Sequence, residues 1–385
     1  MQTATLDVLD RLLAFDTTSR NSNLALIEYA KDFLARHDVE SELILDGTGE
    51  KANLLAVIGP ADRPGIVLSG HTDVVPVDGQ SWSSDPFKAR VEGGRVYGRG
   101  AADMKGYVAA ALALVPRLAR ERLERPVILA LSYDEEVGCK GVGSLVERML
   151  ARLPVPLGCV VGEPTMMRVV DGHKGKVAAR CTVRGREAHS ALPQLGLNAV
   201  VIASRLVGEV ARMGERLAAE GPFAQGFEPP HTTASVGRIE GGSMVNIVPN
   251  HCSFEFEFRA LPEEDPGAHA AEVERFAAGL LPSLRERAPE AAITFEQVLS
   301  YPGFRGDPAS PFQKACMELT GTDRAGKVSY GTEAGHFAKA GVPCVVCGPG
   351  DIAVAHKPDE SIALDQLAAC DRFFDALVER LAVRS

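Results

Sequence analysis

The stretch Ser69-Gly70-His71-Thr72-Asp73 follows an apolar run, residues 65–69, that predicts a short buried strand. The two-residue spacing of His71 and Asp73 puts both side chains on the same side of an extended segment. Open α/β sheets bind ligands outside the carboxyl ends of their strands. An imidazole and a carboxylate at that position can act as a metal ligand and its orienting partner. Taken alone, the same pattern also fits a solvated loop.

Four further segments place acidic residues or a histidine at comparable positions. Asp103 lies in the glycine-flanked turn Gly98-Arg99-Gly100-Ala101-Ala102-Asp103-Met104-Lys105-Gly106, before a predicted helix. Asp134-Glu135-Glu136, Glu163 and His356 follow the predicted strands 127–132, 158–161 and 344–347. Each segment alone reads as loop surface. Together they put several like charges at one sheet edge, where they repel unless a cation neutralises them.

Two histidines and three carboxylates form a natural ligand set for two divalent metals, with one carboxylate shared between them. Asp103 suits the shared position, because the glycines of its turn permit close backbone approach. Glu135 and Glu136 are expected to point to opposite sides of a strand end. One of them can therefore bind metal while the other faces the substrate as a general base.

The order of predicted elements indicates two domains. Strands and helices alternate in residues 1–176 and again in 296–385, which is typical of an α/β fold with a mostly parallel sheet and helices on both faces. Residues 177–295 instead show a β-α-β-β-α-β order, the ferredoxin-like α+β pattern. One of its strands alternates Phe254, Phe256 and Phe258 with polar residues, which predicts one buried face and one wet face.

Bulk properties narrow the location and the partners. A chain of 385 residues is long enough for two cores, and a net charge of −10 disfavours nucleic acid or an anionic membrane surface as a partner. No signal peptide and no membrane span are visible. The eight scattered cysteines, mostly among apolar neighbours, predict buried thiols in a reducing cytoplasm. The Cys344-x-x-Cys347 pair lies in an apolar strand-like run, which favours core packing over metal binding.

The combination of motifs resembles the M20 metallopeptidase family, over nearly the whole chain. The segments that carry the resemblance are Gly70-His71-Thr72-Asp73, Gly100–Gly106, Asp134-Glu135-Glu136, Gly162-Glu163-Pro164 and His356. The resemblance implies a di-zinc amide hydrolase, in which cobalt can substitute. It also implies that residues 1–176 and 296–385 form the catalytic domain and that residues 177–295 form a lid or dimerisation domain.

Site roles follow from the resemblance, residue by residue. It implies that His71 and Glu163 bind one zinc, that Glu136 and His356 bind the other, and that Asp103 bridges them. Further roles concern catalysis and substrate binding. The residues implied are Glu135 as general base and acid, Asp73 orienting His71, His189 polarising the scissile carbonyl from its own or a partner subunit, and Asn246 and Arg259 binding substrate.

Within the family, the segments around Gly331-Thr332-Glu333-Ala334 and Ala355–Glu360 resemble members that deacetylate N2-acetyl-L-ornithine. The activity so implied yields L-ornithine and acetate, serves arginine biosynthesis and belongs to a homodimer. Glu333 is then a candidate partner for the substrate's side-chain ammonium, or an acid at a helix N-terminus. The segment Gly335-His336-Phe337 departs from the family pattern, so this loop is expected to differ locally.

The sequence is also compatible with other functions. Another deacylase or dipeptidase of the family is possible, such as a succinyl-diaminopimelate desuccinylase or an aminoacylase. A non-catalytic binding protein on the same fold is a second alternative. A two-metal phosphoesterase is disfavoured, because the ligand motifs lack the basic residues that a phosphate favours.

Overall fold

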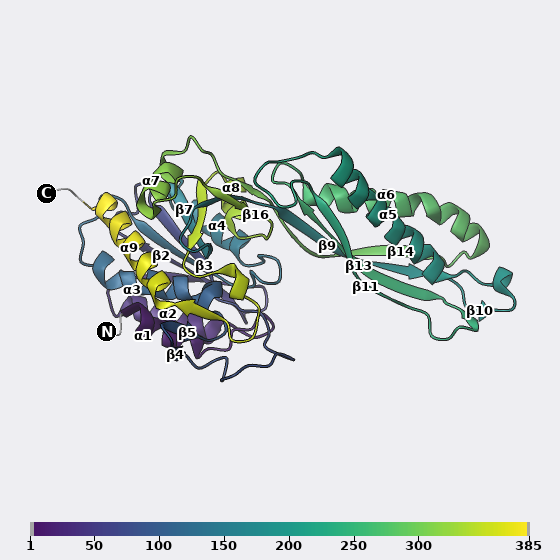
Figure 1. Cartoon of the computed structure of the whole chain (residues 1–385), viewed down its shortest axis with the longest axis horizontal. Coiled ribbons are helices and arrows are strands. Elements are labelled where there is room, and N and C mark those ends of the chain that lie inside the picture. The colour runs from purple at the N-terminus through teal and green to yellow at the C-terminus, as the bar shows by residue number, and fades with distance from the viewer. Residues whose placement is uncertain (1–3, 383–385) are drawn as a thin grey trace. The chain divides into compact units, whose positions relative to one another are not determined.

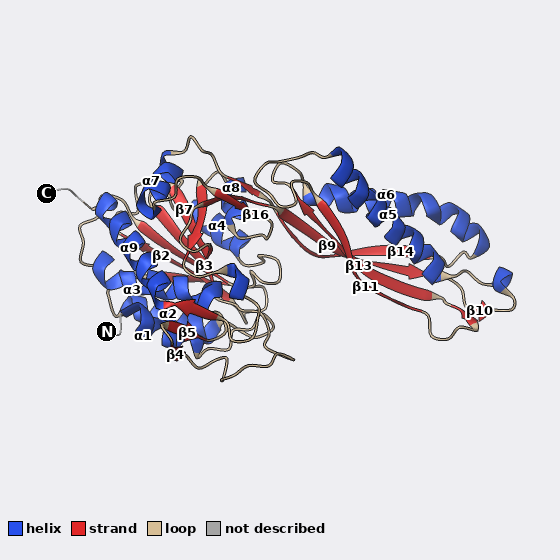
Figure 2. Ribbon diagram, viewed as in Figure 1, coloured by secondary structure: helices blue, strands red, loops and turns tan. Residues whose placement is uncertain are grey.

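The structure, a computed structural model, describes residues 4–382 and divides into two compact units (Figures 1 and 2). Unit 1 comprises the chain up to Gly172, Arg305–Lys327 and the chain from Thr332 onward, and unit 2 comprises His173–Phe304 and Val328–Gly331. The boundaries predicted at 177 and 295 lie inside these limits. The strands at both borders are longer than the apolar pattern indicates, since β9 spans Gly175–Arg184 and β14 spans Ala292–Tyr301.

A nine-stranded sheet forms the centre of unit 1 in the described part of the chain. Its path runs through β1 (Ser41–Leu45), β2 (Ala52–Ile58), β6 (Val127–Ser132), β3 (Ile66–His71), β7 (Gly158–Pro164), β17 (Cys344–Gly348), β8 (Val170–His173) and β15 (Phe304–Arg305), and β16 (Gly326–Val328) pairs with β8. The strands β6, β3, β7 and β17 are parallel to one another, whereas β2 pairs antiparallel with β1 and β6, and β8 pairs antiparallel with β17.

Every residue of these four parallel strands is buried, as expected for strands covered on both faces. The register aligns Ser69 with both Ala130 and Val161. The carboxyl ends of β3, β6 and β7 therefore reach the same edge of the sheet, which positions whatever side chains follow them.

The helices of unit 1 fall into two groups. They are α1 (Ala4–Leu13), α2 (Leu24–Ala35), α3 (Gly106–Leu118), α4 (Val142–Leu150), α7 (Pro311–Thr320), α8 (Ala334–Lys339) and α9 (Leu364–Leu381). The helices α1, α2 and α9 contact α3, and their apolar stripes join one large hydrophobic cluster, while α4 contacts α8 and lies outside that cluster. Helices thus cover both faces, and the predicted α/β architecture is confirmed.

A small three-stranded sheet in unit 1 was not predicted. It pairs β18 (Ser361–Ala363) with β5 (Arg95–Tyr97), and β5 with β4 (Arg90–Glu92). Each strand has only three residues, so no periodic pattern announces it. This sheet joins the segment that follows His356 to the segment that precedes Asp103.

Unit 2 contains a four-stranded antiparallel sheet in the order β11-β13-β9-β14, with two long helices. Besides β9 and β14, its elements are α5 (Ala199–Glu220), β11 (Thr233–Gly241), β13 (His251–Ala260) and α6 (Pro266–Arg287). This sequence of elements is the predicted β-α-β-β-α-β order. Phe254, Phe256 and Phe258 of β13 are buried in its own hydrophobic cluster.

A two-stranded sheet, β10 (Ala188–His189) with β12 (Ile247–Val248), also belongs to unit 2. Among the described residues, no helix combines the length and the apolar character needed to cross a membrane.

Candidate metal centre

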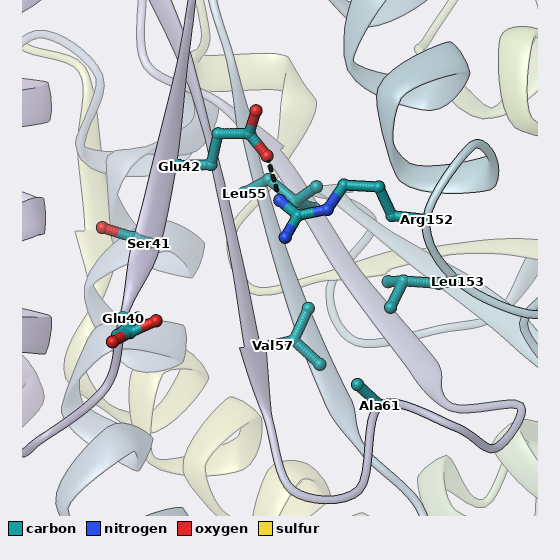
Figure 3. Close-up of a pocket in the computed structure, with 8 residues that line it drawn as sticks. All are labelled: Glu40, Ser41, Glu42, Leu55, Val57, Ala61, Arg152 and Leu153. Carbon is teal, nitrogen blue, oxygen red and sulfur yellow. Dashed lines mark hydrogen bonds and ion pairs between the residues drawn. The ribbon is translucent and has the colours of Figure 1, made fainter.

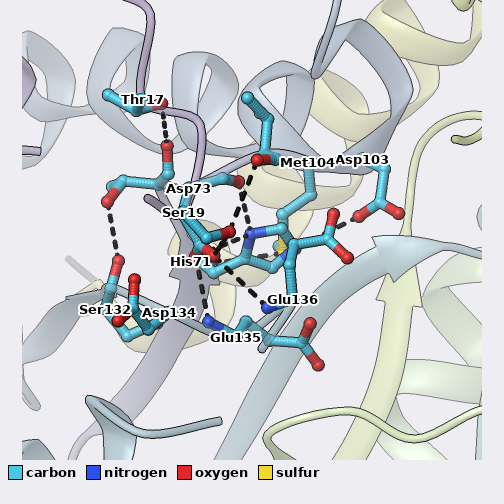
Figure 4. Close-up of polar contacts among 12 residues, drawn as sticks. Thr17, Ser19, His71, Asp73, Asp103, Met104, Ser132, Asp134, Glu135 and Glu136 are labelled. Carbon is cyan, nitrogen blue, oxygen red and sulfur yellow. Dashed lines mark hydrogen bonds and ion pairs between the residues drawn. The ribbon is translucent and has the colours of Figure 1, made fainter. Parts of the chain in front are cut away.

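The predicted metal ligands lie at the carboxyl edge of the parallel strands, and Figure 4 shows three of them, His71, Asp103 and Glu136. His71 is the last residue of β3, and Glu163 is the next-to-last residue of β7. Glu135 and Glu136 follow the end of β6, and His356 follows β17 after a short 3-10 helix, Ile352–Val354. Because these strands are parallel, their carboxyl ends lie at one edge of the sheet and bring these residues together, as the sequence predicts.

Asp103 stands between the two histidines. It lies in the turn Ala101–Lys105, directly before α3, and its own φ of −124° and ψ of 92° are not helical. Its Oδ1 is 3.1 Å from His71 Nε2, and its Oδ2 is 3.2 Å from His356 Nε2. One carboxylate thus faces both imidazoles, which is the arrangement a bridging ligand requires.

The remaining carboxylates join one histidine or the other. Glu163 Oε1 is 3.7 Å from His71 Nε2, and Glu136 Oε2 is 3.1 Å from His356 Nε2. Two sets of ligand atoms lie within 4.8 Å of one another: His71, Glu135 and Glu163 form the first, and His71, Asp103 and Glu136 form the second. Since Glu135 belongs to the first set, the geometry alone leaves it within reach of a cation.

Asp73 organises the cluster from behind. Its Oδ1 is 3.5 Å from His71 Nδ1, while the backbone carbonyl of Asp73 is 2.9 Å from the same nitrogen. The amide of Glu135 donates to Asp73 Oδ1 at 3.0 Å and that of Glu136 to Oδ2 at 3.3 Å, as Figure 4 shows. Ser19 Oγ also donates to Oδ2, at 2.7 Å.

The reason expected for the divergence of Glu135 and Glu136 is wrong. Both residues lie in a turn after β6, which begins where Asp134 has a φ of 56°, and the alternation of a strand does not apply there. Their surroundings differ nevertheless. Glu136 approaches His356, whereas Glu135 Oε1 accepts from the thiol of Cys139 at 3.4 Å.

Burial and crowding shift the proton affinities of the cluster. Burial and the Asp103 carboxylate raise the pKa of Glu136 to about 7, and hydrogen bonds to Asp103 and Glu136 raise the pKa of His356 to about 10. Burial is also the main cause that holds the pKa values of Glu135 and Glu163 well above their usual range. A cluster that holds protons this strongly is one that a bound cation would relieve.

The donor set fits divalent cations. Glu136 Oε1 and Glu163 Oε1 are buried and have no hydrogen-bond partner among the described residues. An unsatisfied buried carboxylate oxygen is costly, and coordination to a metal supplies the missing partner. Imidazole nitrogens together with carboxylate oxygens suit zinc and similar ions.

The predicted residues of unit 2 lie in two places. His189 is exposed in β10, where its Nδ1 accepts from the amide of Ala191 at 3.0 Å. Asn246 is also exposed, and it lies beside His189, since its backbone carbonyl accepts from the amide of Ser190 at 3.0 Å. Arg259 lies near the other end of β13, bound to Glu257 Oε1 at 2.9 Å. The eight steps along the strand from His251 to Arg259 span roughly 26 Å, so Arg259 does not join the other two.

Glu333 directly precedes α8, and the structure places its side chain in the core. Its side chain has no exposed surface, and its oxygens accept from the hydroxyls of Ser69, at 3.0 Å, and Ser132. It therefore satisfies hydroxyls of β3 and β6 inside the core. The Gly-Thr-Glu-Ala motif indicates an acid near the site, but it does not reveal whether the carboxylate faces the site or the core.

Two residues near the centre were given no role by the sequence. Ser19 supports Asp73 from a loop far away in the chain, and no motif marks it. Glu360 is buried, and its carboxylate accepts from the amide of Asp103 at 3.0 Å. The signal for Glu360 was its place just after His356, in the segment Ala355–Glu360.

A pocket elsewhere in unit 1 does not compete with this site. It has a volume of about 280 Å³ and lies against β1 and β2 (Figure 3). Two of its charged side chains are paired with each other, since Glu42 binds Arg152 as well as Arg148 nearby. No set of potential metal ligands lines it.

Comparisons with known proteins agree with this geometry. Residues 67–380 match the model of the peptidase family M20/M25/M40. The acetylornithine deacetylase of Myxococcus xanthus is 37% identical over 94% of this chain and 93% of its own length. That of Pasteurella multocida (strain Pm70) is 32% identical over 89% and 87%.

Two solved structures share the fold at low sequence identity. An M20-family metallo-carboxypeptidase from Sulfolobus solfataricus has a TM-score of 0.77 at 20% identity, over 97% of this chain and 98% of its own. A dinuclear metal-binding M20 peptidase from Bacillus subtilis has a TM-score of 0.65 at 15% identity, over 98% of each chain. The family model covers most of the chain and the relatives nearly all of it, so this protein belongs to the peptidase family M20/M25/M40.

Proposed function

We propose that this enzyme removes the acetyl group from N2-acetyl-L-ornithine, giving L-ornithine and acetate. The observation that carries the chemistry is the cluster of His71, Asp103 and His356 with buried, unsatisfied glutamates at one sheet edge. The substrate assignment is supported by the two deacetylases that are 37% and 32% identical to the chain.

Two divalent ions, zinc with cobalt as a substitute, would occupy the cluster. His71 and Glu163 would hold one ion, His356 and Glu136 the other, and Asp103 both, as the spacing of their ligand atoms allows. Bound there, the ions would lower the pKa of a water molecule and polarise the acetyl carbonyl. Asp73 keeps the His71 ring oriented through Nδ1, so that Nε2 faces the cluster.

Glu135 is the proposed proton carrier. It lies beside the ligand set and accepts only a weak thiol hydrogen bond, so its carboxylate is free to receive a proton from the attacking water. Burial raises the pKa of Glu135 well above the usual range, which makes its carboxylate a stronger base than an exposed one. The same group would then give the proton to the leaving amine.

The substrate groups would meet side chains of unit 2. Arg259 is proposed to clamp the α-carboxylate, since a guanidinium can form two parallel hydrogen bonds with it. Asn246 and His189 are proposed to contact the acyl part, with His189 polarising the scissile carbonyl. Roughly 26 Å of strand separates Arg259 from His251, at the end of β13 that follows Asn246 in the chain. One small substrate is therefore not expected to contact Arg259 and the other two residues of the same unit 2.

This separation supports a homodimer, in which one unit 2 serves two active sites. Unit 2 also exposes several large apolar side chains, as an interface between copies requires. They are Leu192, Leu195, Val201, Ile239, Met244 and Val245. The eight cysteines are free and buried, which is compatible with the proposed place in cytoplasmic arginine biosynthesis.

A substrate panel tests the assignment. The metal-replete enzyme is assayed on N2-acetyl-L-ornithine, N-acetyl-L-methionine, N-succinyl-L,L-diaminopimelate and a dipeptide. We expect kcat/KM to be highest for acetylornithine. Preference for the succinylated compound or the dipeptide would overturn the substrate but keep the hydrolase, and no turnover of any amide by protein that holds its metals would favour a binding protein.

A further inference from the structure

Glu360 is a buried carboxylate with four donors, all from the five residues that end at Asp103. Its side chain is 1% exposed. Its Oε1 accepts from the amides of Ala102 and Asp103, each at 3.0 Å. Its Oε2 accepts from the amide of Gly100 at 3.1 Å and from Arg99 Nη1 at 2.6 Å.

These contacts fix the backbone that carries the proposed bridging ligand. Three amides converge on one carboxylate, so the turn before α3 cannot rotate without breaking several charge-assisted hydrogen bonds in a buried site. Asp103 is thereby held with its two oxygens 3.1 Å and 3.2 Å from the two histidines. The same carboxylate cannot be a metal ligand itself, because its oxygens already have partners.

A second branch leads from Glu360 to His356. Arg99, whose Nη1 binds Glu360, donates from Nη2 to Gln80 Oε1 at 2.6 Å. Gln80 Nε2 then donates to the backbone carbonyl of His356 at 2.9 Å. The His356 side chain is 52% exposed, so packing alone does not hold it, and this hydrogen bond restrains its loop.

We propose that Glu360 is a positioning residue for the metal centre, holding Asp103 directly and His356 through Arg99 and Gln80. The inference rests on the proposed metal site. Arg99 balances the charge of Glu360 and lies 5.0 Å from the ring of Trp82, so the pair acts through geometry and adds little net charge to the centre.

The role needs a carboxylate. A glutamine at this position has one acceptor oxygen and one NH2 group. The NH2 group would therefore face N–H donors of the turn or of Arg99 that now bind a carboxylate oxygen. Glu360→Gln is therefore similar in shape but disturbs the turn. Asp171→Asn is the matched control, because Asp171 is also a buried carboxylate of unit 1, which accepts from Gln313 Nε2 at 3.1 Å and contacts none of the proposed ligands.

The experiment is a metal titration of metal-free protein. Wild type, Glu360→Gln and Asp171→Asn are titrated with Zn²⁺ by calorimetry and with Co²⁺ by visible absorption, after circular dichroism has shown that each is folded. We expect Glu360→Gln to bind about 10- to 100-fold more weakly, with an altered cobalt spectrum, and the control to bind like wild type. A folded Glu360→Gln with wild-type affinity and spectrum overturns the inference.

The failures of the two proposals can be told apart, and a second variant covers misfolding. Wild type that takes up no divalent ion would overturn the metal site itself. If Glu360→Gln does not fold, Gln80→Leu decides, because Gln80 is partly exposed. Its loss removes the hydrogen bonds to His356, Arg99 and Trp82, while Glu360 keeps the amides of the Asp103 turn. Weaker binding of one of the two ions supports the inference, and unchanged binding of both overturns it.

Discussion

Glu135 and Glu136 are neighbours in the chain with different proposed tasks. Glu136 lies against His356, so Glu136→Ala should lower the metal content of purified protein. Glu135→Ala should leave the metal content near wild type and lower kcat by about 100- to 10,000-fold, since general acid–base catalysis typically contributes that much. Elemental analysis and steady-state kinetics on the same samples make the comparison.

Glu135 also lies within 4.8 Å of the ligand atoms of His71 and Glu163, so the opposite outcome has a structural meaning. Metal loss in Glu135→Ala, together with full occupancy in Glu136→Ala, would exchange the two roles. Glu135→Gln serves as the shape-matched control, because it keeps the volume of the side chain while it removes the proton acceptor.

His336 should make stability depend on pH. Burial, together with Lys339, lowers its pKa from 6.5 to about 4. Between these values the unfolded chain binds more protons than the folded one, so the free energy of unfolding falls as the pH falls from about 6.5 to 4. His336→Leu should remove about 2 to 3 kcal/mol of that decline.

The measurement for His336 is urea unfolding of metal-free protein at several pH values, with the exposed His251→Leu as control. Parallel curves for wild type and His336→Leu would contradict the prediction.

For single residues, the sequence predicts the position of those that directly follow a strand. His71, Glu163 and His356 were found because an apolar run precedes each one and parallel strands end together. The burial of Glu333 could not be predicted from its motif, because its partners Ser69 and Ser132 come from β3 and β6, which are distant in the chain. Glu360 received no role, since its partners become visible only when a distant turn folds around it.

Among the elements, strand β13 should contribute strongly to the stability of unit 2. The Phe256 ring is 2% exposed and lies 5.7 Å and 6.1 Å, between centroids, from Phe254 and Phe258. Phe256→Ala should destabilise unit 2 by about 3 to 5 kcal/mol, through lost burial and the cavity left behind. Glu255→Ala, on the wet face of the same strand, should cost at most about 1 kcal/mol, because it breaks only a surface ion pair with Arg180.

Calorimetric unfolding of metal-loaded protein checks this prediction. The transition assigned to unit 2 should move in Phe256→Ala, while the metal content of unit 1 stays unchanged. If Phe256→Ala also lowered the metal content, the hydrophobic clusters of the two units would not behave independently.

Element prediction succeeds where a segment has enough residues to show a period. The strands β1 and β6 have the bounds that the apolar pattern predicts, Ser41–Leu45 and Val127–Ser132. The short strands β4, β5, β10, β12 and β18 were missed, because two or three residues acquire strand conformation from their partners and carry no pattern of their own.

For the whole molecule, activity should depend on two divalent ions. Treatment with a chelator should abolish turnover of the amide, and addition of zinc or cobalt should restore it, with two equivalents of metal regained. Metal-free protein has several carboxylates crowded at one sheet edge, so its thermal midpoint should also be lower than that of the loaded protein. Full activity in protein shown to be metal-free would end this interpretation.

The proposed dimer allows a test by mixing subunits. His189→Ala and Glu135→Ala homodimers should each be nearly inactive. If His189 acts on the partner's site, a mixed dimer contains one site with both residues intact, and activity should reappear. Mass spectrometry confirms that mixed dimers have formed, and the absence of activity in them would assign His189 to its own chain.

The order of the strands has a consequence for biosynthesis. The strand β17 lies between β7 and β8 in the central sheet, yet it is encoded after the whole of unit 2. A ribosome therefore releases all of unit 2 before the sheet of unit 1 can close, although unit 1 begins first. Domains generally fold as units during synthesis, so the nascent chain must hold β3, β6 and β7 with one edge open while unit 2 folds. His356 follows β17, so the last proposed metal ligand emerges when most of the chain has left the ribosome.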